Sequence, residues 1–364
     1  MINIMLSVVA MLISMLPNYY IIKKFSKVFQ LGIDYSTSEP QKFHTEPTPR
    51  LGGASIFISL FICSIVIFMK KPAGDGTLLI MLICFLPTLI VGLLEDFTRK
   101  VSPYVRLIGS FLTAYFVISQ MAIYLPYIDI PIIDWIFRST FLHYLFFLIC
   151  VGGVINAFNI IDGYNGLVSG VTLLVFLAYS YVSYEVGERE IFTLCLVIIS
   201  AILGFFFWNF PSGKIFAGDT GAYLLGFLSA VIGLLLVQKS GKVSAWFILV
   251  VLIYPVWETI FSIFRKLFIT QQSPFKPDGF HFHMLIYKSL HQIEDSGKSR
   301  ISIDRNARTS ILLWLFSTTS IFPAVIFFNK RRWLIFFGLL FLIIYTVLYV
   351  VLLFFVKENV ESNE

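Results

Sequence analysis

Charged residues are scarce in this chain, since Asp, Glu, Lys and Arg make up only 13% of its 364 residues, against roughly a quarter in soluble domains. The chain also lacks a Ser-, Gly- and Pro-rich linker that would mark a boundary between domains. Hydrophobic residues make up 58% of the chain, and phenylalanine alone occurs 39 times. We therefore expect one polytopic membrane unit that covers residues 1–364.

Cysteine is rare as well, with four residues, and each of them lies inside a long apolar run. None has the spacing of a metal-binding pair, and such cysteines are usually small buried apolar residues. The pattern therefore predicts no metal site at the cysteines and indicates no redox compartment.

The N-terminal segment has neither a basic start nor a small-residue cleavage site. Its lysines, Lys23, Lys24 and Lys27, follow the apolar stretch instead of preceding it. This order is not that of a cleavable signal peptide. We expect a retained first helix with its N-terminus outside and its basic end inside.

Long apolar runs account for most of the chain, and a helix that crosses a bilayer needs roughly 20 mainly apolar residues. We therefore predict an all-α integral membrane protein with about eleven transmembrane helices, or ten if one of the two weaker runs, 77–94 and 167–184, does not cross. The other predicted helices are 3–20, 51–69, 105–125, 141–160, 191–210, 222–238, 245–264, 310–328 and 333–356.

The distribution of Lys and Arg sets the expected orientation. With the N-terminus outside, 18 of the 27 basic residues fall on the inside, which leaves 9 outside. The positive-inside rule favours this arrangement, although the basic segment 329–332 falls on the outside. The net charge of +6 suits a protein beside an anionic leaflet, so we expect membrane lipid and no nucleic acid as a partner.

Five loops are dense in Gly, Pro, Asn, Asp and charged residues: 42–53, 95–106, 156–167, 211–222 and 265–308. In the eleven-helix arrangement all five lie on the cytoplasmic face. Five polar loops placed independently of the topology would rarely share one face. The sequence therefore predicts a composite active site at the cytoplasmic surface.

The side chains of these loops suit phosphate chemistry. Carboxylates at membrane depth usually face a cavity or a partner, and Mg²⁺ prefers carboxylate oxygens while it shares phosphate ligands. Each residue taken singly has an ordinary explanation: a helix-end acidic pair, loop polarity for the histidines, a positive-inside anchor, or packing. The argument rests on the number of such residues and on their shared face. They are Glu95, Asp96, Asp162, Asp219, Lys214, Arg265, His281 and His283.

Several motifs occur in these loops in a characteristic order. They are TPRLGG (48–53), GLLED (92–96), NAFNIIDG (156–163), FAGDTG (216–221) and SPF (273–275) followed by Asp278 and HFH (281–283). In these motifs the chain resembles the polyprenyl-phosphate N-acetylhexosamine-1-phosphate transferases over about residues 45 to 315. Within that family its Ser-Pro-Phe…His-x-His version is similar to the undecaprenyl-phosphate GlcNAc-1-phosphate transferases, not to the phospho-N-acetylmuramoyl-pentapeptide branch.

The resemblance implies a bacterial inner-membrane enzyme that moves a sugar-1-phosphate from a UDP-sugar to undecaprenyl phosphate, with Mg²⁺ or Mn²⁺ as cofactor, and so starts a surface glycan such as O-antigen or capsule. A homodimer is compatible with it. The implied catalytic residues are Glu95, Asp96, Asp162, His281 and His283; the substrate-binding residues are Arg50, Asn156, Asn159, Asn165, Lys214, Phe216, Arg265 and Asp278; the metal ligands are Asp219 and Asp96.

Three positions depart from the family pattern: Glu95 replaces Asp, Asn165 replaces Asp, and Met284 replaces His. These departures leave the sugar undetermined. Two other functions stay open, a secondary transporter and a catalytically inactive scaffold. Transporters place their sites near the bilayer midplane, whereas these polar residues lie at one face. We further expect the 265–309 segment to be a long cytoplasmic loop that closes over the pyrophosphate.

Overall fold

The structure is a computed structural model in which almost every described residue outside short connections is helical. In chain order the helices are α1 (Ile2–Tyr20), α3 (Gly52–Lys70), α4 (Thr77–Cys84), α5 (Leu86–Thr98), α6 (Pro103–Met121), α7 (Pro131–Ile136), α8 (Thr140–Ile161), α9 (Leu167–Val186), α10 (Arg189–Asn209), α11 (Gly218–Ser240), α12 (Ala245–Val251), α13 (Ile253–Phe264), α14 (Phe282–Asp295), α15 (Arg305–Ile326) and α16 (Arg331–Glu361), and the π-helical turns η1 (Ile21–Phe25) and η2 (Arg265–Ile269) extend α1 and α13. The described residues are 2–25, 32–34, 47–70, 76–276, 278–295 and 304–361.

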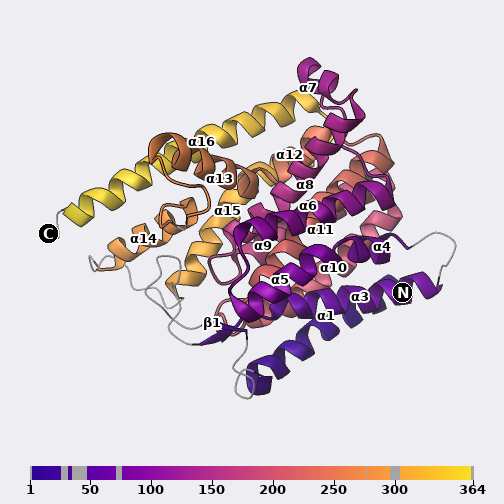
Figure 1. Cartoon of the computed structure of the whole chain (residues 1–364), viewed down its shortest axis with the longest axis horizontal. Coiled ribbons are helices and arrows are strands. Elements are labelled where there is room, and N and C mark those ends of the chain that lie inside the picture. Colours follow the sequence, from indigo (N-terminus) through magenta and orange to yellow (C-terminus); the bar gives the residue numbers. More distant parts are fainter. Residues whose placement is uncertain are drawn as a thin grey trace.

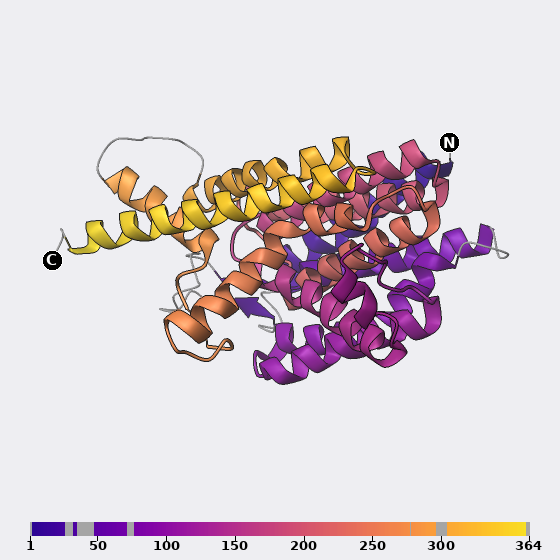
Figure 2. The ribbon, with the colours of Figure 1, turned by 90° about the horizontal axis from the view of Figure 1, so that it is seen from above.

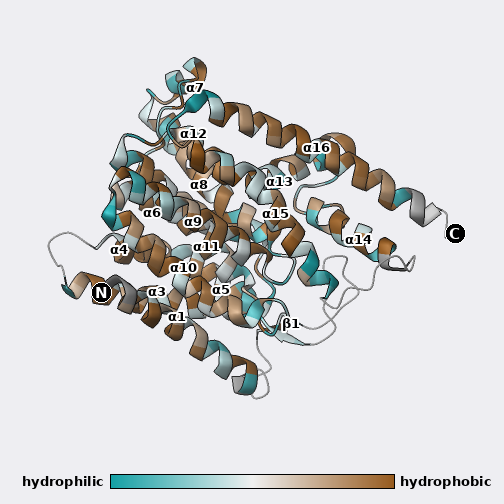
Figure 3. Ribbon diagram, turned by 180° about the vertical axis from the view of Figure 1, so that it is seen from behind, coloured by the Kyte–Doolittle hydropathy of each residue, from teal (hydrophilic) through white to brown (hydrophobic). Residues whose placement is uncertain are grey.

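The long helices run side by side in one bundle (Figure 1). The N-terminus and α7 lie at one end of the bundle, and β1 (Ile33–Asp34), α14 and the C-terminus lie at the other, in both Figure 1 and Figure 2. Colouring by hydropathy shows apolar residues along the helices and polar residues gathered at the two ends (Figure 3). This pattern is what a bilayer around the bundle requires.

The prediction of an all-α membrane protein is confirmed in its main features. Within the described residues, eight helices are long and apolar enough to cross a membrane: α1, α3, α8, α9, α10, α11, α15 and α16. Two bent pairs, α4 with α5 and α12 with α13, raise this number to ten if each pair crosses once. The predicted eleventh crossing falls on α6, which is not among these candidates and buries polar residues such as Ser110 and Thr113.

Both bent pairs break where the sequence is uniformly apolar. The axis turns by 53° between α4 and α5 and by 70° between α12 and α13. Each break is a single residue, Phe85 or Leu252, and a proline follows in the first turn or two of the next helix. Proline cannot donate a backbone hydrogen bond to the preceding turn, so a bend near it is expected. The hydropathy pattern predicted each pair as one helix, 77–94 and 245–264, and did not indicate the bend.

Helix α11 forms the centre of the bundle, and its membrane-length window is buried along its whole length. It packs against α8, α5, α3 and α9. Glycine allows the closest of these approaches, because a Cβ atom at Gly53 would lie 2.1 Å from the backbone nitrogen of Gly221. Small residues at such crossings bring helix backbones together within a membrane. The N-terminus of α11 is thereby fixed against α3 and α5.

The segment after η2 is more ordered than a long loop. It contains α14, a 14-residue helix that begins at Phe282, directly after His281. Helix α14 packs against α16 and α15. The predicted long cytoplasmic loop 265–309 therefore contains a helix at residues 282–295, and residues 296–303 lie outside the described part of the chain.

The predicted topology leads to a labelling experiment. We expect single cysteines placed within 270–276 to be shielded from an impermeant thiol reagent in intact cells, and cysteines within 126–138 to react, because these segments lie at opposite ends of the bundle. A cysteine-free background is needed, since Cys150 is exposed on the bundle surface. Labelling of 270–276 from outside would reverse the orientation. The full prediction places residues 36–48 and 270–308 in the cytoplasm and 126–138 outside, and most of 36–48 lies outside the described residues.

Candidate active site

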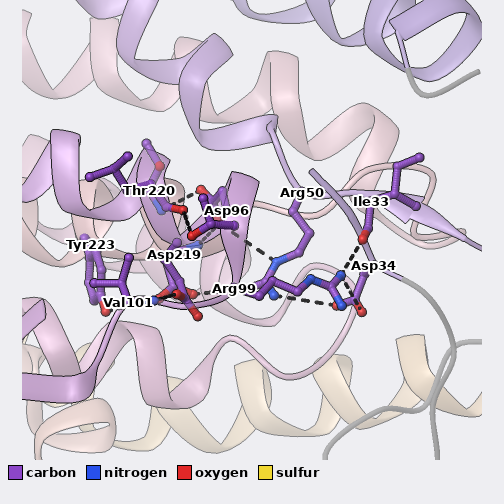
Figure 4. A network of polar contacts seen from close by, with 12 residues as sticks. Ile33, Asp34, Arg50, Asp96, Arg99, Val101, Asp219, Thr220 and Tyr223 are labelled. Carbon is purple, nitrogen blue, oxygen red and sulfur yellow. Dashed lines mark hydrogen bonds and ion pairs between the residues drawn. The ribbon is translucent and has the colours of Figure 1, made fainter. Parts of the chain in front are cut away.

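The N-terminus of α11 is held by Asp96, which lies in α5 and is fully buried. Its two carboxylate oxygens accept the backbone N–H groups of Asp219 (2.7 Å) and Thr220 (3.0 Å), as Figure 4 shows. These N–H groups belong to the first turn of α11, where no carbonyl of the same helix is available. Asp96 therefore acts here as the cap of α11, and it fixes where Asp219 projects.

Asp219 lies between two arginines. Its Oδ1 accepts a hydrogen bond from Arg50 Nη2 at 3.0 Å, and its Oδ2 accepts one from Arg106 Nη1 at 2.9 Å and one from the Tyr223 hydroxyl at 3.2 Å. Burial alone would lower the pKa of Arg50, but the nearby carboxylates of Asp219 and Asp96 raise it. Two permanent positive charges thus face each other across one carboxylate.

A second carboxylate extends this network towards the end of the bundle that carries β1. Asp34, in β1, forms ion pairs with Arg99 at 2.9 Å and with Arg50 at 3.8 Å (Figure 4). Strand β1 pairs antiparallel with β2 (Thr48–Pro49), the strand directly before Arg50. The short ribbon therefore sets the position of the Arg50 guanidinium between the two acidic groups.

Residues from all five predicted loops line one cavity of about 420 Å³, which is within the usual size range of small-molecule sites. Its lining includes basic side chains, carboxylates, amides and aromatic rings, so it suits a polyanionic ligand with a planar group. The residues predicted from the sequence that line it are Arg50, Glu95, Asn159, Asp162, Asn165, Phe216, Asp219, His281 and His283.

Two of the lining carboxylates differ in their surroundings. Glu95 accepts the backbone N–H of Val101 at 2.9 Å and lies 3.9 Å from Arg106. Asp162 follows the last residue of α8, and burial raises its pKa to about 7, although the charge of Arg50 opposes this rise. At neutral pH, Asp162 is therefore poised between its protonated and ionised forms, which is a feature of functional carboxyls.

The two motif histidines lie at the start of α14 and stack with ring centroids 5.3 Å apart. Burial lowers the pKa of His283 to about 4, so this ring is neutral at physiological pH. It lies over the turn after α8, because a Cβ atom at Gly163 would be 3.4 Å from His283 Nε2. His283 can therefore offer one hydrogen-bond donor or acceptor to a ligand without bringing a charge.

Asn165 is held on a rigid turn between α8 and α9. Its side-chain amide donates to the carbonyl oxygen of Pro211 at 3.0 Å, and its backbone N–H donates to Asn306 Oδ1 at 2.6 Å. The next residue, Gly166, has φ +77° and donates its N–H to Asn209 Oδ1 at 2.7 Å. The contact with Pro211 uses one of the two N–H groups of the Asn165 amide, and Asn165 lines the cavity.

Several predicted site residues do not line the cavity. Asn156 donates to Ser110 Oγ and to the Gly152 carbonyl, both at 2.8 Å, within the helix bundle. The Lys214 ammonium lies over the Trp208 ring. Arg265 and Asp278 form an ion pair at 2.8 Å, and Asp96 is fully buried and is not among the lining residues.

Sequence reasoning missed three residues of this region. Arg106 was counted only as an inside charge, Asp34 lies outside the recognised motifs, and Glu258 hydrogen-bonds to His281. Glu258 left a visible signal, because it is the only charged residue in the apolar run 245–264, and such a residue indicates a functional or paired site. Arg106 and Asp34 left none that distinguishes them from other loop charges.

The fit of a divalent cation can be tested on the donor set. In the described part of the chain, no three His, Cys, Asp or Glu side chains lie close enough to hold one ion together. Asp96 uses both oxygens for N–H groups and Asp219 uses both for arginine and tyrosine donors. In this arrangement these two carboxylates do not fit a metal site, because backbone N–H groups occupy the oxygens of Asp96, and arginine and tyrosine donors occupy those of Asp219.

The central part of the chain matches a family model, and most of the chain is similar to known proteins. Residues 78–237 match the family model described as glycosyl transferase family 4. The chain is 26% identical over 349 residues to a probable undecaprenyl-phosphate N-acetylglucosaminyl 1-phosphate transferase of Bacillus subtilis (strain 168), covering 95% of this chain and 90% of the relative. The resemblance noted from the motifs is confirmed.

Two further relatives carry the names of related transferases. An undecaprenyl-phosphate alpha-N-acetylglucosaminyl 1-phosphate transferase of Thermotoga maritima is 28% identical over 252 residues, which cover 69% of this chain and 72% of the relative. A phospho-N-acetylmuramoyl-pentapeptide-transferase of Bacillus thuringiensis (strain Al Hakam) is 30% identical over 202 residues, covering 53% of this chain and 62% of the relative. Both branches considered from the motifs are thus represented among similar proteins.

Proposed function

Because residues 78–237 match the family model described as glycosyl transferase family 4, we propose that this chain transfers a sugar-1-phosphate, most simply an N-acetylhexosamine-1-phosphate, from a UDP-sugar to undecaprenyl phosphate. The observation that carries the proposal is the convergence of all five polar loops on one cavity at one end of a membrane bundle. A membrane lipid phosphate and a water-soluble nucleotide can meet at such a place.

The proposed reaction joins two anions. An oxygen of the lipid phosphate attacks the β-phosphorus of the UDP-sugar, the bond from that phosphorus to the bridging oxygen breaks, and UMP leaves with the released electron pair. Phosphoryl transfer is catalysed mainly by positioning and by neutralising charge. A phosphate monoester has a second pKa of about 6, so the nucleophile is largely ionised without a strong base.

The cavity supplies charge neutralisation from its own side chains. Arg50 and Arg106 reach the lining beside Asp219, and Lys266 and Lys276 also line the cavity. We assign the arginines to the pyrophosphate, where their forked donors suit phosphate oxygens. Asp162, with its pKa of about 7, can hold or release a proton as the phosphates arrive. Asp219 holds the guanidinium groups of the two arginines in position.

Magnesium dependence stays a prediction. Asp219 is the expected ligand from its motif, yet a cation that binds there has to displace at least one guanidinium from the carboxylate. The side-chain roles given above do not involve the metal. Comparing turnover in EDTA with turnover after adding back Mg²⁺ or Mn²⁺ would test the requirement directly.

The wider role follows from the same proposal. We place the protein in a bacterial inner membrane with the cavity facing the cytoplasm, where UDP-sugars are made, and assign it to the first step of a lipid-linked surface glycan such as O-antigen or capsule. Helix number, orientation and pathway are separate questions, so the labelling experiment and a glycan analysis of a deletion strain test them independently.

The experiment that tests the activity measures UMP release by the purified protein in detergent. We expect release only when a UDP-N-acetylhexosamine and undecaprenyl phosphate are both present, together with a radiolabelled lipid product. A panel of UDP-sugars then identifies the donor. Flux of a substrate across proteoliposomes without UMP release would favour a transporter, and neither signal would favour an inactive scaffold.

Nucleotide selectivity gives a further prediction. We expect uridine nucleotides to bind at least about tenfold more tightly than cytidine nucleotides, because the carbonyl oxygen of Asn165 can accept the uracil N–H while Phe216 offers an aromatic face. Competition of UDP and CDP against the donor measures this. Equal inhibition by the two nucleotides would show that Asn165 does not read the base.

A further inference from the structure

Glu258 lies in α13, inside a candidate membrane-crossing pair of helices, and is only 1% exposed. A carboxylate at this depth is destabilising unless it is paired and hydrogen-bonded. None of the motifs that define the proposed activity contains it. Its hydrogen-bond partners therefore indicate why a buried negative charge lies at this position.

The contacts of Glu258 come from two other helices. Its Oε1 accepts the backbone N–H of Phe282 at 3.0 Å and lies 3.0 Å from Nδ1 of His281. Its Oε2 accepts the hydroxyl of Tyr345, in α16, also at 3.0 Å. The carboxylate therefore caps the start of α14, contacts one motif histidine and is itself held by the last helix.

These contacts fix the tautomer of His281. Oε1 of an ionised carboxylate can only accept, so the nitrogen that faces it has to carry a proton. A proton on Nδ1 leaves Nε2 as the ring atom directed away from Glu258. His281 lines the cavity, and its Nε2 lies 3.7 Å from Asp278 Oδ1, beyond hydrogen-bond distance. Nε2 is thus the atom that can meet a ligand phosphate or exchange a proton with it.

We propose that Glu258 is a positioning residue, which fixes His281 in the Nδ1–H form and aims its Nε2 at the cavity, with Tyr345 holding Glu258 in turn. The proposal rests on the proposed function for its kinetic consequence, but the tautomer is a property of the protein alone. It also gives α16 a part in the site, although no residue of α16 lines the cavity among the described residues.

A simpler interpretation is that Glu258 only caps α14. The two interpretations require different hydrogen bonds. A cap needs an acceptor for the Phe282 N–H alone, whereas the orientation of His281 also needs an acceptor at Nδ1. Glu258→Gln can supply both through its amide oxygen while its NH₂ group faces Tyr345. Glu258→Leu supplies neither. Glu190→Gln is the matched control, because Glu190 pairs with Lys239 at the opposite end of the bundle.

The first measurement needs no substrate. ¹⁵N NMR of histidine-labelled protein, with His281 assigned by its loss in His281→Gln, reports which ring nitrogen carries the proton at neutral pH. We expect a protonated Nδ1 in the wild type and in Glu258→Gln, and a shift towards Nε2–H in Glu258→Leu. An Nε2–H signal with a bare Nδ1 in the wild type would overturn the proposal, whether or not the protein releases UMP.

The second measurement is kinetic. We expect Glu258→Leu to lower kcat by about tenfold to a hundredfold, with KM for the UDP-sugar changed less than about threefold, since an imidazole in the wrong tautomer impairs catalysis more than binding. Glu258→Gln should restore kcat to within about threefold, and Glu190→Gln should match the wild type. Equal kcat in the folded Leu and Gln variants would reduce Glu258 to a structural cap.

Tyr345→Phe keeps the test informative if Glu258→Leu does not fold. It removes one hydrogen bond from Oε2 and leaves the cap of α14 intact. We expect a fall in kcat of about threefold to tenfold, together with a mixture of the two His281 tautomers. Unchanged kcat and a single Nδ1–H signal would remove Tyr345 from the positioning chain. A wild type that releases no UMP but shows Nδ1–H would refute the activity and leave the tautomer assignment standing.

Discussion

Asp219→Asn should lower kcat for UMP release by at least about a hundredfold. Asparagine keeps the size of the side chain but removes the charge that lies between Arg50 and Arg106. Its NH₂ group would face one of these guanidiniums as a second donor, so at least one arginine has to move out of position. The measurement is kcat at saturating UDP-sugar and saturating Mg²⁺.

A suitable control for this variant is Asp134→Asn. Asp134 accepts the N–H of Ile128 in the connection before α7, at the other end of the bundle. It should keep the wild-type kcat, and both variants should show the wild-type thermal unfolding midpoint to within a few degrees. Turnover by Asp219→Asn close to that of Asp134→Asn would remove Asp219 from the chemistry.

His283→Ala should lower kcat/KM for the UDP-sugar by about tenfold to a thousandfold, as the loss of a preorganised hydrogen-bond donor does. The ring is buried between the Gly163 turn and His281, and it lines the cavity. Because burial lowers its pKa to about 4, the ring stays neutral above pH 5. The loss should therefore be the same at every pH from 6 to 8.

His143→Ala provides the comparison for that result. His143 accepts the N–H of Leu125 at 3.2 Å, near the end of the bundle that carries α7, so its removal should leave kcat/KM unchanged. The alternative is that the basic segment 265–309 merely rests on anionic lipid and does not contact the substrate. In that case His283→Ala and His143→Ala would have the same kinetics. A loss in His283→Ala that disappears at high pH would instead indicate that a charged imidazole is required.

The helical architecture and the grouping of the polar loops could be predicted from the sequence because both follow from local composition. An apolar run long enough to cross a bilayer has few alternatives to a helix, and the parity of the runs assigns the loops to a side. The cavity residues Asp162 and Asp219 were found in this way, whereas Arg50 was implied only by the family resemblance. That these residues lie on one side of the membrane could be predicted without knowing how the helices pack.

The remaining features depend on contacts between distant parts of the chain. The pair of Arg50 with Asp219 joins residues 169 positions apart, and the pair of Glu258 with Tyr345 joins residues 87 positions apart. No periodicity reports such pairs. Helix α11 was predicted to start at residue 222, but it starts at Gly218, because the carboxylate of Asp96 supplies acceptors for its first turn. Because a residue of another helix caps it, α11 therefore begins earlier in the chain than the hydropathy pattern predicted.

The central position of α11 has a consequence for which substitutions the chain can accept over evolution. A helix with lipid on one side can exchange one large apolar residue for another there at little cost, and α16, of whose window only 22% is buried, has that freedom. Helix α11 has protein on every side, so an added methylene overpacks a neighbour and a removed one leaves a void. Among relatives and in saturation mutagenesis, α11 should therefore vary least in side-chain volume, even at positions far from the cavity.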